Sequence, residues 1–137
     1  DPWMTTPESA LALVLVLDQF PRNMFRGQPQ AFATDSKALE VAQTAIALSF
    51  DQNLPAIQRF FFYLPFEHSE DLDHQNQAVQ LFEQFRNDPE LNDTYDYALR
   101  HRAVIERFGR FPHRNVILGR TSTLEEIEFL KQPGSSF

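Results

Sequence analysis

HRAVIERFGRFPHRNVILGR, residues 101–120, is the stretch that decides how this chain folds. Its first half predicts a helix, because apolar residues follow His101 at i+4 and i+7 on one face. Gly109 and Pro112 then predict the end of that helix, the glycine through a left-handed cap and the proline through its missing amide hydrogen. Arg, His and Asn dominate the residues after this helix end, so the sequence predicts a helical framework that presents a cationic site.

Arginine is concentrated around this stretch. Residues 100–120 contain six Arg and one Glu, a formal charge of 6 − 1 = +5, whereas the whole chain carries −7 and the remainder therefore −7 − 5 = −12. Such a cluster in an acidic protein needs anionic partners, either in the same chain or in a ligand. The acidic overall charge argues against a general nucleic-acid binder.

A stretch near the amino terminus repeats the pattern. Residues 19–27, QFPRNMFRG, and residues 110–120, RFPHRNVILGR, both contain Phe-Pro, then Arg-Asn, then apolar residues and a Gly beside an Arg. Each comes after an apolar helical run. We predict that the two segments are helix ends of similar shape that meet and form one positively charged hollow.

The composition is that of an ordinary globular domain. The 137 residues suffice for one domain with a core, and 14 Phe predict an aromatic interior. The absence of cysteine excludes disulfides and fits a reducing compartment. The longest apolar run, residues 10–17, has eight residues against the roughly 18 that a membrane span needs, and no basic signal segment precedes it. The sequence predicts one cytoplasmic domain over residues 1–137.

Helix signals recur along the chain, and no long stretch alternates with period two. The expected helices begin after Thr6, near Thr34 or Asp35, at Pro55, near residue 69 and at about Asn92. A last short helix is expected to begin with a capping box formed by Thr123 and Glu126. Pro21 and Pro65 are expected to end the first and third of these helices. About six helices with short connections predict an all-α fold of stacked antiparallel hairpins, although no strict repeat of about 34 residues is visible.

Three segments in order, LDQFPRNMFRG, FYLPFEHSEDLDHQ and HRAVIERFGRFPHRNVILGR, with EEIEFL after them, resemble a bacterial family of unknown function, number nine-two-four of the domain-of-unknown-function series. The resemblance covers about residues 11–137. It implies a tetratricopeptide-like superhelix and no established reaction. Members usually begin with a further segment rich in Trp and Phe, so we expect this chain to lack an N-terminal helical segment and the face it covers to be exposed or covered by another molecule.

The residues after the two Phe-Pro pairs form the candidate ligand site. A guanidinium fork fits two oxygens of a carboxylate or phosphate, and Asn side chains add orienting hydrogen bonds. The predicted ligand-binding residues are Arg22, Asn23, Arg110, His113, Arg114, Asn115 and Arg120, supported by Asp18, Glu70 and His101. An equally weighted interpretation is structural: the Arg side chains pair with Asp18, Glu67 or Glu70 and cap helix ends.

A second motif contains His68 and Glu70. Histidine titrates near neutrality and a carboxylate can orient it, so His68, Glu70 and His113 are candidate catalytic residues. No nucleophile motif accompanies them. With His101 included, the spacing matches no known pattern of metal ligands, so we predict no metal and no cofactor.

The leading hypothesis is a binding module for an anionic ligand, either a small phosphate or carboxylate compound or an acidic peptide. The alternatives are a hydrolase acting on an anionic substrate in the same pocket and a purely structural or protein-interaction domain. The sequence predicts no membrane partner and leaves open a protein partner and a homo-oligomer.

Overall fold

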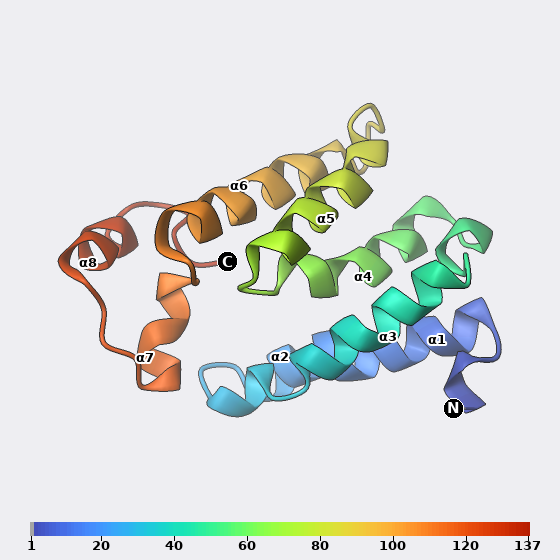
Figure 1. Ribbon diagram of the computed structural model, residues 1–137, viewed down its shortest axis with the longest axis horizontal. Helices are drawn as coiled ribbons and strands as arrows, with labels where there is room; N and C mark the ends of the chain where they lie inside the picture. The colour runs from blue at the N-terminus through green and yellow to red at the C-terminus, as the bar shows by residue number, and fades with distance from the viewer. Residues whose placement is uncertain (1) are drawn as a thin grey trace.

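The computed structural model describes residues 2–137, and every regular element in that range is helical, which confirms the all-α prediction. The longer helices are α1 (Pro7–Val14), α3 (Asp35–Ala47), α4 (Ala56–Glu67), α5 (Leu72–Phe82) and α6 (Asn92–Phe108). In this order each packs on the next and runs in the opposite direction (Figure 1). The shorter helices are α2 (Phe20–Met24), α7 (Asn115–Leu118) and α8 (Leu124–Leu130).

The core lies between the long helices and is aromatic on one side. Alanine side chains on the inner face of α3 are fully buried and let its neighbours approach closely. Phe62, Tyr63 and Phe82 are also fully buried, and the rings of Tyr63 and Phe82 meet edge to face at 5.8 Å. The Tyr63 hydroxyl donates to Asp51 Oδ2 at 2.6 Å, so the core contains a satisfied polar group.

The first helix does not end at Pro21, and that prediction is wrong. The chain passes from α1 through a π-helical segment, η2 (Leu15–Gln19), directly into α2. Pro21 has no amide hydrogen to donate to the carbonyl of Leu17, and Thr34 Oγ1 donates to that carbonyl instead, at 2.6 Å. The altered helical turn and this hydroxyl together accommodate the proline.

The prediction that Pro65 ends the third helix is wrong as well. Pro65 lies inside the last turn of α4, and the amide of His68 closes that turn on the carbonyl of Leu64 at 2.9 Å. The helix expected near residue 69 begins at Leu72, where the side chain of Asp71 is the N-cap. Two other predicted boundaries are confirmed. Gly109 caps α6 with φ of 72°, and Thr123 begins α8 with a capping box.

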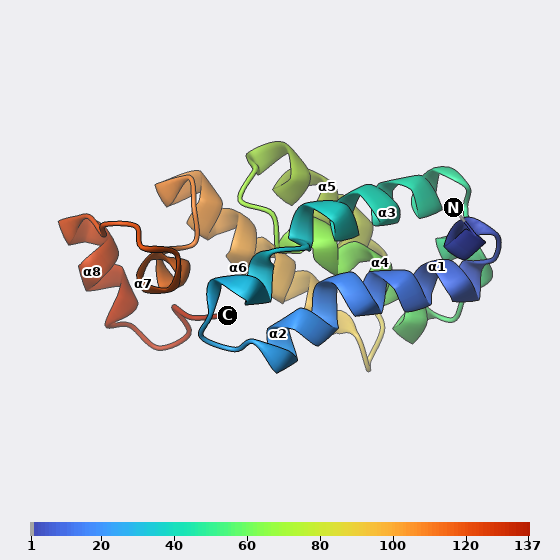
Figure 2. The same cartoon turned by 90° about the horizontal axis from the view of Figure 1, so that it is seen from below.

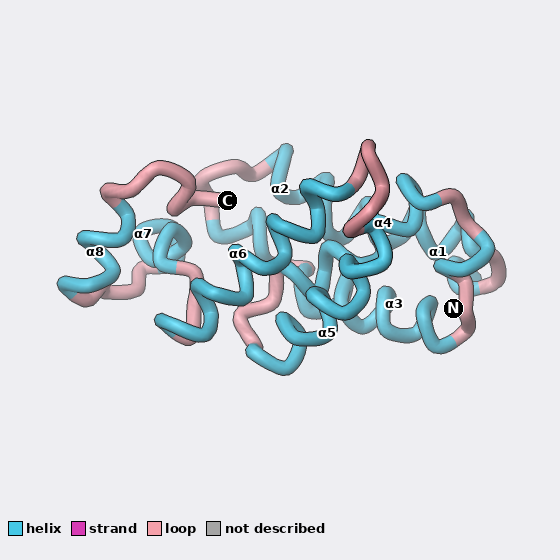
Figure 3. Tube along the Cα trace, turned by 90° about the horizontal axis from the view of Figure 1, so that it is seen from above, coloured by secondary structure: helices cyan, strands magenta, loops and turns pink. Residues whose placement is uncertain are grey.

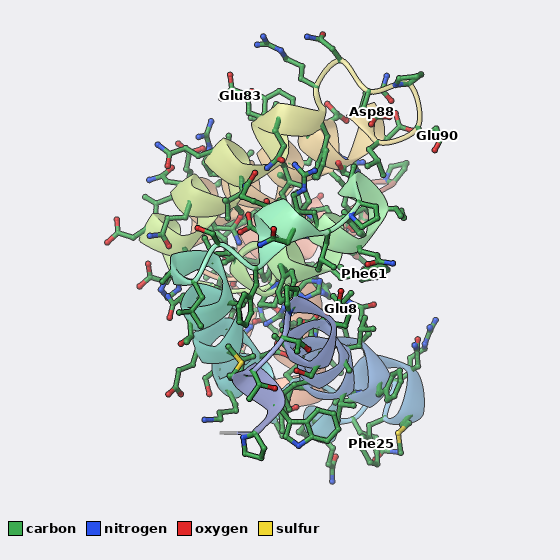
Figure 4. The ribbon with its side chains drawn as sticks, turned by 90° about the vertical axis from the view of Figure 1, so that its right-hand side faces the viewer. Glu8, Phe25, Phe61, Glu83, Asp88 and Glu90 are labelled. Carbon is green, nitrogen blue, oxygen red and sulfur yellow. The ribbon has the colours of Figure 1, made fainter. Side chains whose placement is uncertain are left out.

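The two Phe-Pro segments lie at the same side of the molecule. The 3₁₀ turn η6 (Pro112–Arg114) and α7 approach α2, and the C-terminus lies between α2 and α6 (Figures 2 and 3). Figure 4 views the opposite end, where Glu83, Asp88 and Glu90 lie around the turn between α5 and α6. None of the helices within residues 2–137 combines the length and hydropathy needed to cross a bilayer.

Candidate functional site

A cavity of about 670 Å³ lies where the two Phe-Pro segments meet, within the size range of small-molecule sites. The segment α2 contributes Arg22 and Asn23 to its wall, and η6 contributes His113 and Arg114. The C-terminal end of α4 and the middle of α6 supply further polar groups. The structure thus brings the arginines of two segments about ninety residues apart in sequence to one hollow.

Arg22 is largely occupied by carboxylates of its own chain. Its Nη1 and Nη2 donate to Asp35 Oδ1 and Oδ2 at 2.7 and 2.8 Å. Nη1 also donates to the backbone oxygen of Asp18 at 2.8 Å and to its Oδ1 at 3.2 Å. Arg22 therefore lines the cavity wall with its charge balanced by two carboxylates and with few free donors.

Asp18 is fully buried in the π-helical segment and orients a histidine. Its Oδ1 lies 2.7 Å from His68 Nδ1, and its Oδ2 accepts from Gln19 Nε2 at 2.6 Å. Burial alone raises the pKa of Asp18, but the charges of His68 and Arg22 outweigh burial and hold it below its ordinary value of 3.8. Asp18 thus contacts His68 as well as Arg22, the residue that it was predicted to support.

Arg114 differs from Arg22, Arg110 and Arg120 because its guanidinium forms no ion pair with a carboxylate of residues 2–137. Only 7% of the residue is exposed, and the guanidinium lies between the rings of Phe32 and Phe111, at 4.4 and 4.8 Å from their centroids. Its Nη2 donates to the backbone oxygen of His68 at 2.9 Å, whereas Nε is buried and has no hydrogen-bond partner among residues 2–137. Burial lowers the pKa of Arg114 to about 10, so the group stays cationic at neutral pH.

Three predicted ligand-binding residues do not line the cavity, because they form a structural network beside it. Arg120 pairs with Glu70 through two hydrogen bonds of 2.9 and 3.1 Å, and Arg110 pairs with Glu126 at 2.9 and 2.8 Å. Asn115 is fully buried and accepts from Arg120 Nε at 3.0 Å. These contacts favour the structural interpretation for the three residues, because most of their donors and acceptors have partners in the chain.

Glu70 belongs to this network, which corrects its predicted partnership with His68. Besides Arg120, its Oε2 accepts from the amide of Phe111 at 2.6 Å. Although burial raises the pKa of Glu70, these hydrogen bonds outweigh it and lower the pKa below its ordinary value. Glu70 fixes the segment that carries η6 and does not reach the cavity, so it is not placed for acid–base chemistry there.

Two further histidines in the cavity wall are uncharged at neutral pH. Burial lowers the pKa of His101 to about 3 and that of His113 to about 4. His101 Nδ1 donates to the Tyr97 carbonyl at 2.8 Å, and the ring of Phe137 stacks on it at 3.8 Å. His113 Nδ1 is buried and finds no hydrogen-bond partner in the described part of the chain. These imidazoles offer hydrogen bonds without adding charge.

The sequence interpretation did not place several residues in the cavity. The most informative is Glu67, which it considered only as a partner for Arg and which forms no ion pair with an Arg of residues 2–137. It is only 4% exposed, and its Oε1 lies 3.9 Å from His101 Nδ1. The signal was present, because Glu67 continues the apolar stripe of Phe60 and Leu64 on α4, where a carboxyl is unusual. Arg26, Tyr97 and Phe137 also line the cavity without having been predicted.

The described residues define an all-α protein of packed helical hairpins with a cationic, partly aromatic cavity between two helix ends. Residues 1–134 match the family described as "Bacterial protein of unknown function (DUF924)", and the chain belongs to that family. The solved structure of a protein of unknown function from Agrobacterium tumefaciens is similar, with a TM-score of 0.90 and 46% identity over 96% of this chain and 72% of that chain. No curated protein matches the sequence.

Within residues 2–137, no group of three or more His, Asp or Glu side chains is arranged to hold a metal ion. The resemblance carried by the three sequence segments is confirmed by the family match.

Proposed function

We propose that the protein is a binding module whose cavity takes a small organic anion on Arg114. One observation carries this proposal: within residues 2–137, Arg114 is a buried arginine that forms no ion pair and whose Nε has no hydrogen-bond partner, whereas Arg22, Arg110 and Arg120 each have a carboxylate. Leaving a buried donor unsatisfied costs about 1–3 kcal/mol. An anionic oxygen in the cavity offsets that cost and neutralises the charge.

The apolar part of the wall supports a ligand with a flat apolar body. Phe32, Phe60 and Phe111 line the cavity beside the guanidinium. His101 and His113 add uncharged hydrogen-bonding groups at the same wall. Because the cavity is small and partly aromatic, it favours a compact aromatic carboxylate or phosphate over an acidic peptide.

A binding experiment with matched probes tests the anchor. Phenyl phosphate is expected to raise the Tm and to bind in calorimetry, and Arg114→Gln is expected to weaken that binding about 10- to 100-fold, because a charged hydrogen bond of roughly 1.5–3 kcal/mol is lost. Inorganic phosphate and benzyl alcohol each supply only half of the ligand and should bind more weakly. The control is Arg86→Gln, which removes an exposed Arg outside the cavity.

Equal affinity in wild type and Arg114→Gln contradicts the anchor. Absence of binding by phenyl phosphate and by benzoate contradicts the cavity as an anion site and favours a structural role for Arg114. Tighter binding by an acidic peptide than by either compound points to the peptide interpretation.

A further inference from the structure

We propose that this cavity also hydrolyses a small ester that carries an anionic group, with His68 as general base, oriented by Asp18, and Glu67 as general acid. The inference rests on the proposed function, because Arg114 must hold the anionic end of the substrate. It goes beyond binding by assigning a reaction to groups that anion binding alone does not require.

The base is defined by a hydrogen bond between two helices that are far apart in sequence. The carboxylate of Asp18 lies 2.7 Å from His68 Nδ1, and the side chain of Asp18 is 1% exposed. A buried carboxylate on Nδ1 fixes the tautomer and stabilises the imidazolium that forms when the ring accepts a proton. His68 lines the cavity, so Nε2 is the ring nitrogen available to a bound water.

The acid is the neighbouring residue in the same helix end. Glu67 lines the cavity beside His68, is almost fully buried and forms no ion pair shorter than 3.9 Å within the described chain. Burial and the nearby charge of Asp18 raise the pKa of Glu67 to about 8, so its carboxyl keeps a proton at neutral pH. An oriented base and a protonated acid thus line the same cavity, as acid–base catalysis needs.

Water is the nucleophile that this wall allows. The described lining contains no serine or cysteine, and the hydroxyl of Thr94 already donates to the Leu91 carbonyl at 2.6 Å. A carbonyl ester is the matching substrate class, because a base assists the addition of water to its carbon and an acid assists the departure of the alcohol.

Water, His68 and Glu67 together supply and accept every proton that the hydrolysis needs. His68 Nε2 takes a proton from water as the water oxygen bonds to the ester carbon. The bond from that carbon to the leaving oxygen then breaks, its electron pair goes to that oxygen, and the Glu67 carboxyl supplies the proton. The imidazolium proton returns to the Glu67 carboxylate. One ester and one water give one acid and one alcohol.

Several charged or titratable groups lie around His68. They are Asp18 from η2, Arg22 from α2, Glu67 from α4, His101 from α6 and Arg114 from η6. Turnover is expected to fall above about pH 8, where Glu67 loses its proton. In Glu67→Gln that alkaline decline should disappear together with most of the rate.

The test uses 4-acetoxybenzoate, an anionic aromatic ester, with release of 4-hydroxybenzoate as the readout. Wild-type protein is expected to accelerate hydrolysis over buffer, and His68→Gln to lower the rate at least about 100-fold. Affinity for 4-hydroxybenzoate should change less than about threefold in that variant, because the anion anchor remains. Glu67→Gln is nearly isosteric and keeps the site neutral, so it tests the acid even if His68→Gln folds poorly.

The control is His74→Gln on α5, outside the cavity, which should hydrolyse the ester like wild type. If wild type binds 4-hydroxybenzoate but hydrolyses the ester no faster than His68→Gln, catalysis is overturned and the binding function stands. If no aromatic anion binds, the proposed function fails and this inference fails with it. Equal hydrolysis of neutral phenyl acetate overturns the requirement for an anionic group.

Discussion

Replacing Asp18 by Ala is expected to destabilise the protein by about 3–5 kcal/mol, the range for removing one member of a buried ion pair. Its carboxylate is fully buried and receives hydrogen bonds from Gln19, Arg22 and His68. Alanine leaves these three donors without their common acceptor. Urea unfolding followed by circular dichroism at pH 7 measures the loss.

The pH response of Asp18 gives a second readout of the same interaction. Because its pKa in the folded protein lies below the ordinary value of 3.8, its contribution is complete above pH 3.8 and is lost as the pH falls through the folded pKa. Asp96→Ala, at an exposed position of α6, is the matched control and should change stability by less than about 0.5 kcal/mol. A loss for Asp18→Ala as small as that of the control contradicts the proposed network.

Replacing Glu67 by Gln is expected to stabilise the protein at alkaline pH by roughly 3–5 kcal/mol relative to wild type. The folded protein keeps Glu67 protonated to about pH 8, whereas the unfolded chain ionises it near 4.5. The wild type therefore loses stability as the pH rises from about 4.5 to about 8, and the loss is complete above that. Glutamine does not titrate, so the gap between the two curves should open across this window.

Urea unfolding of wild type and Glu67→Gln at intervals from pH 4 to pH 9 measures the difference in their free energies of unfolding. His101 and His113 have lowered pKa values that affect stability at acid pH in both proteins. Their effect cancels when the free energy of unfolding of one protein is subtracted from that of the other. Glu125→Gln, on the exposed side of α8, supplies a control that should follow the wild-type curve. Parallel curves for wild type and Glu67→Gln show that Glu67 is ionised in the folded protein and remove it as the acid.

The sequence predicted the long helices well because their signals are local. The fifth expected helix, from about Asn92 to Phe108, coincides with α6, since its apolar stripe and the Gly109 cap both lie within the segment itself. The Thr123 capping box is equally local. The predictions for Pro21 and Pro65 were wrong because a proline ends a helix only when nothing else accommodates it. For Pro21, the accommodating hydroxyl comes from Thr34, at the start of α3.

The sequence predicted which residue types form the site but not which arginines pair with carboxylates. Arg22 and Arg114 reach one cavity, whereas Arg110 and Arg120 pair with Glu126 and Glu70. Sequence spacing cannot distinguish an arginine that pairs with a carboxylate from one that lines a cavity without such a pair, because both have the same local sequence signals. The tetratricopeptide-like arrangement implied by the resemblance stays a prediction.

By itself, the sequence determined that this protein is helical, where most helices begin and end, and that arginines are concentrated in two Phe-Pro segments. These properties depend on side chains within one or two turns of each other. Only the tertiary structure decided that Asp18 meets His68 across fifty residues and that Arg114 is buried without a carboxylate. The reason is physical: an ion pair depends on a few ångströms of separation and on exclusion of water, and both are set by how distant helices pack.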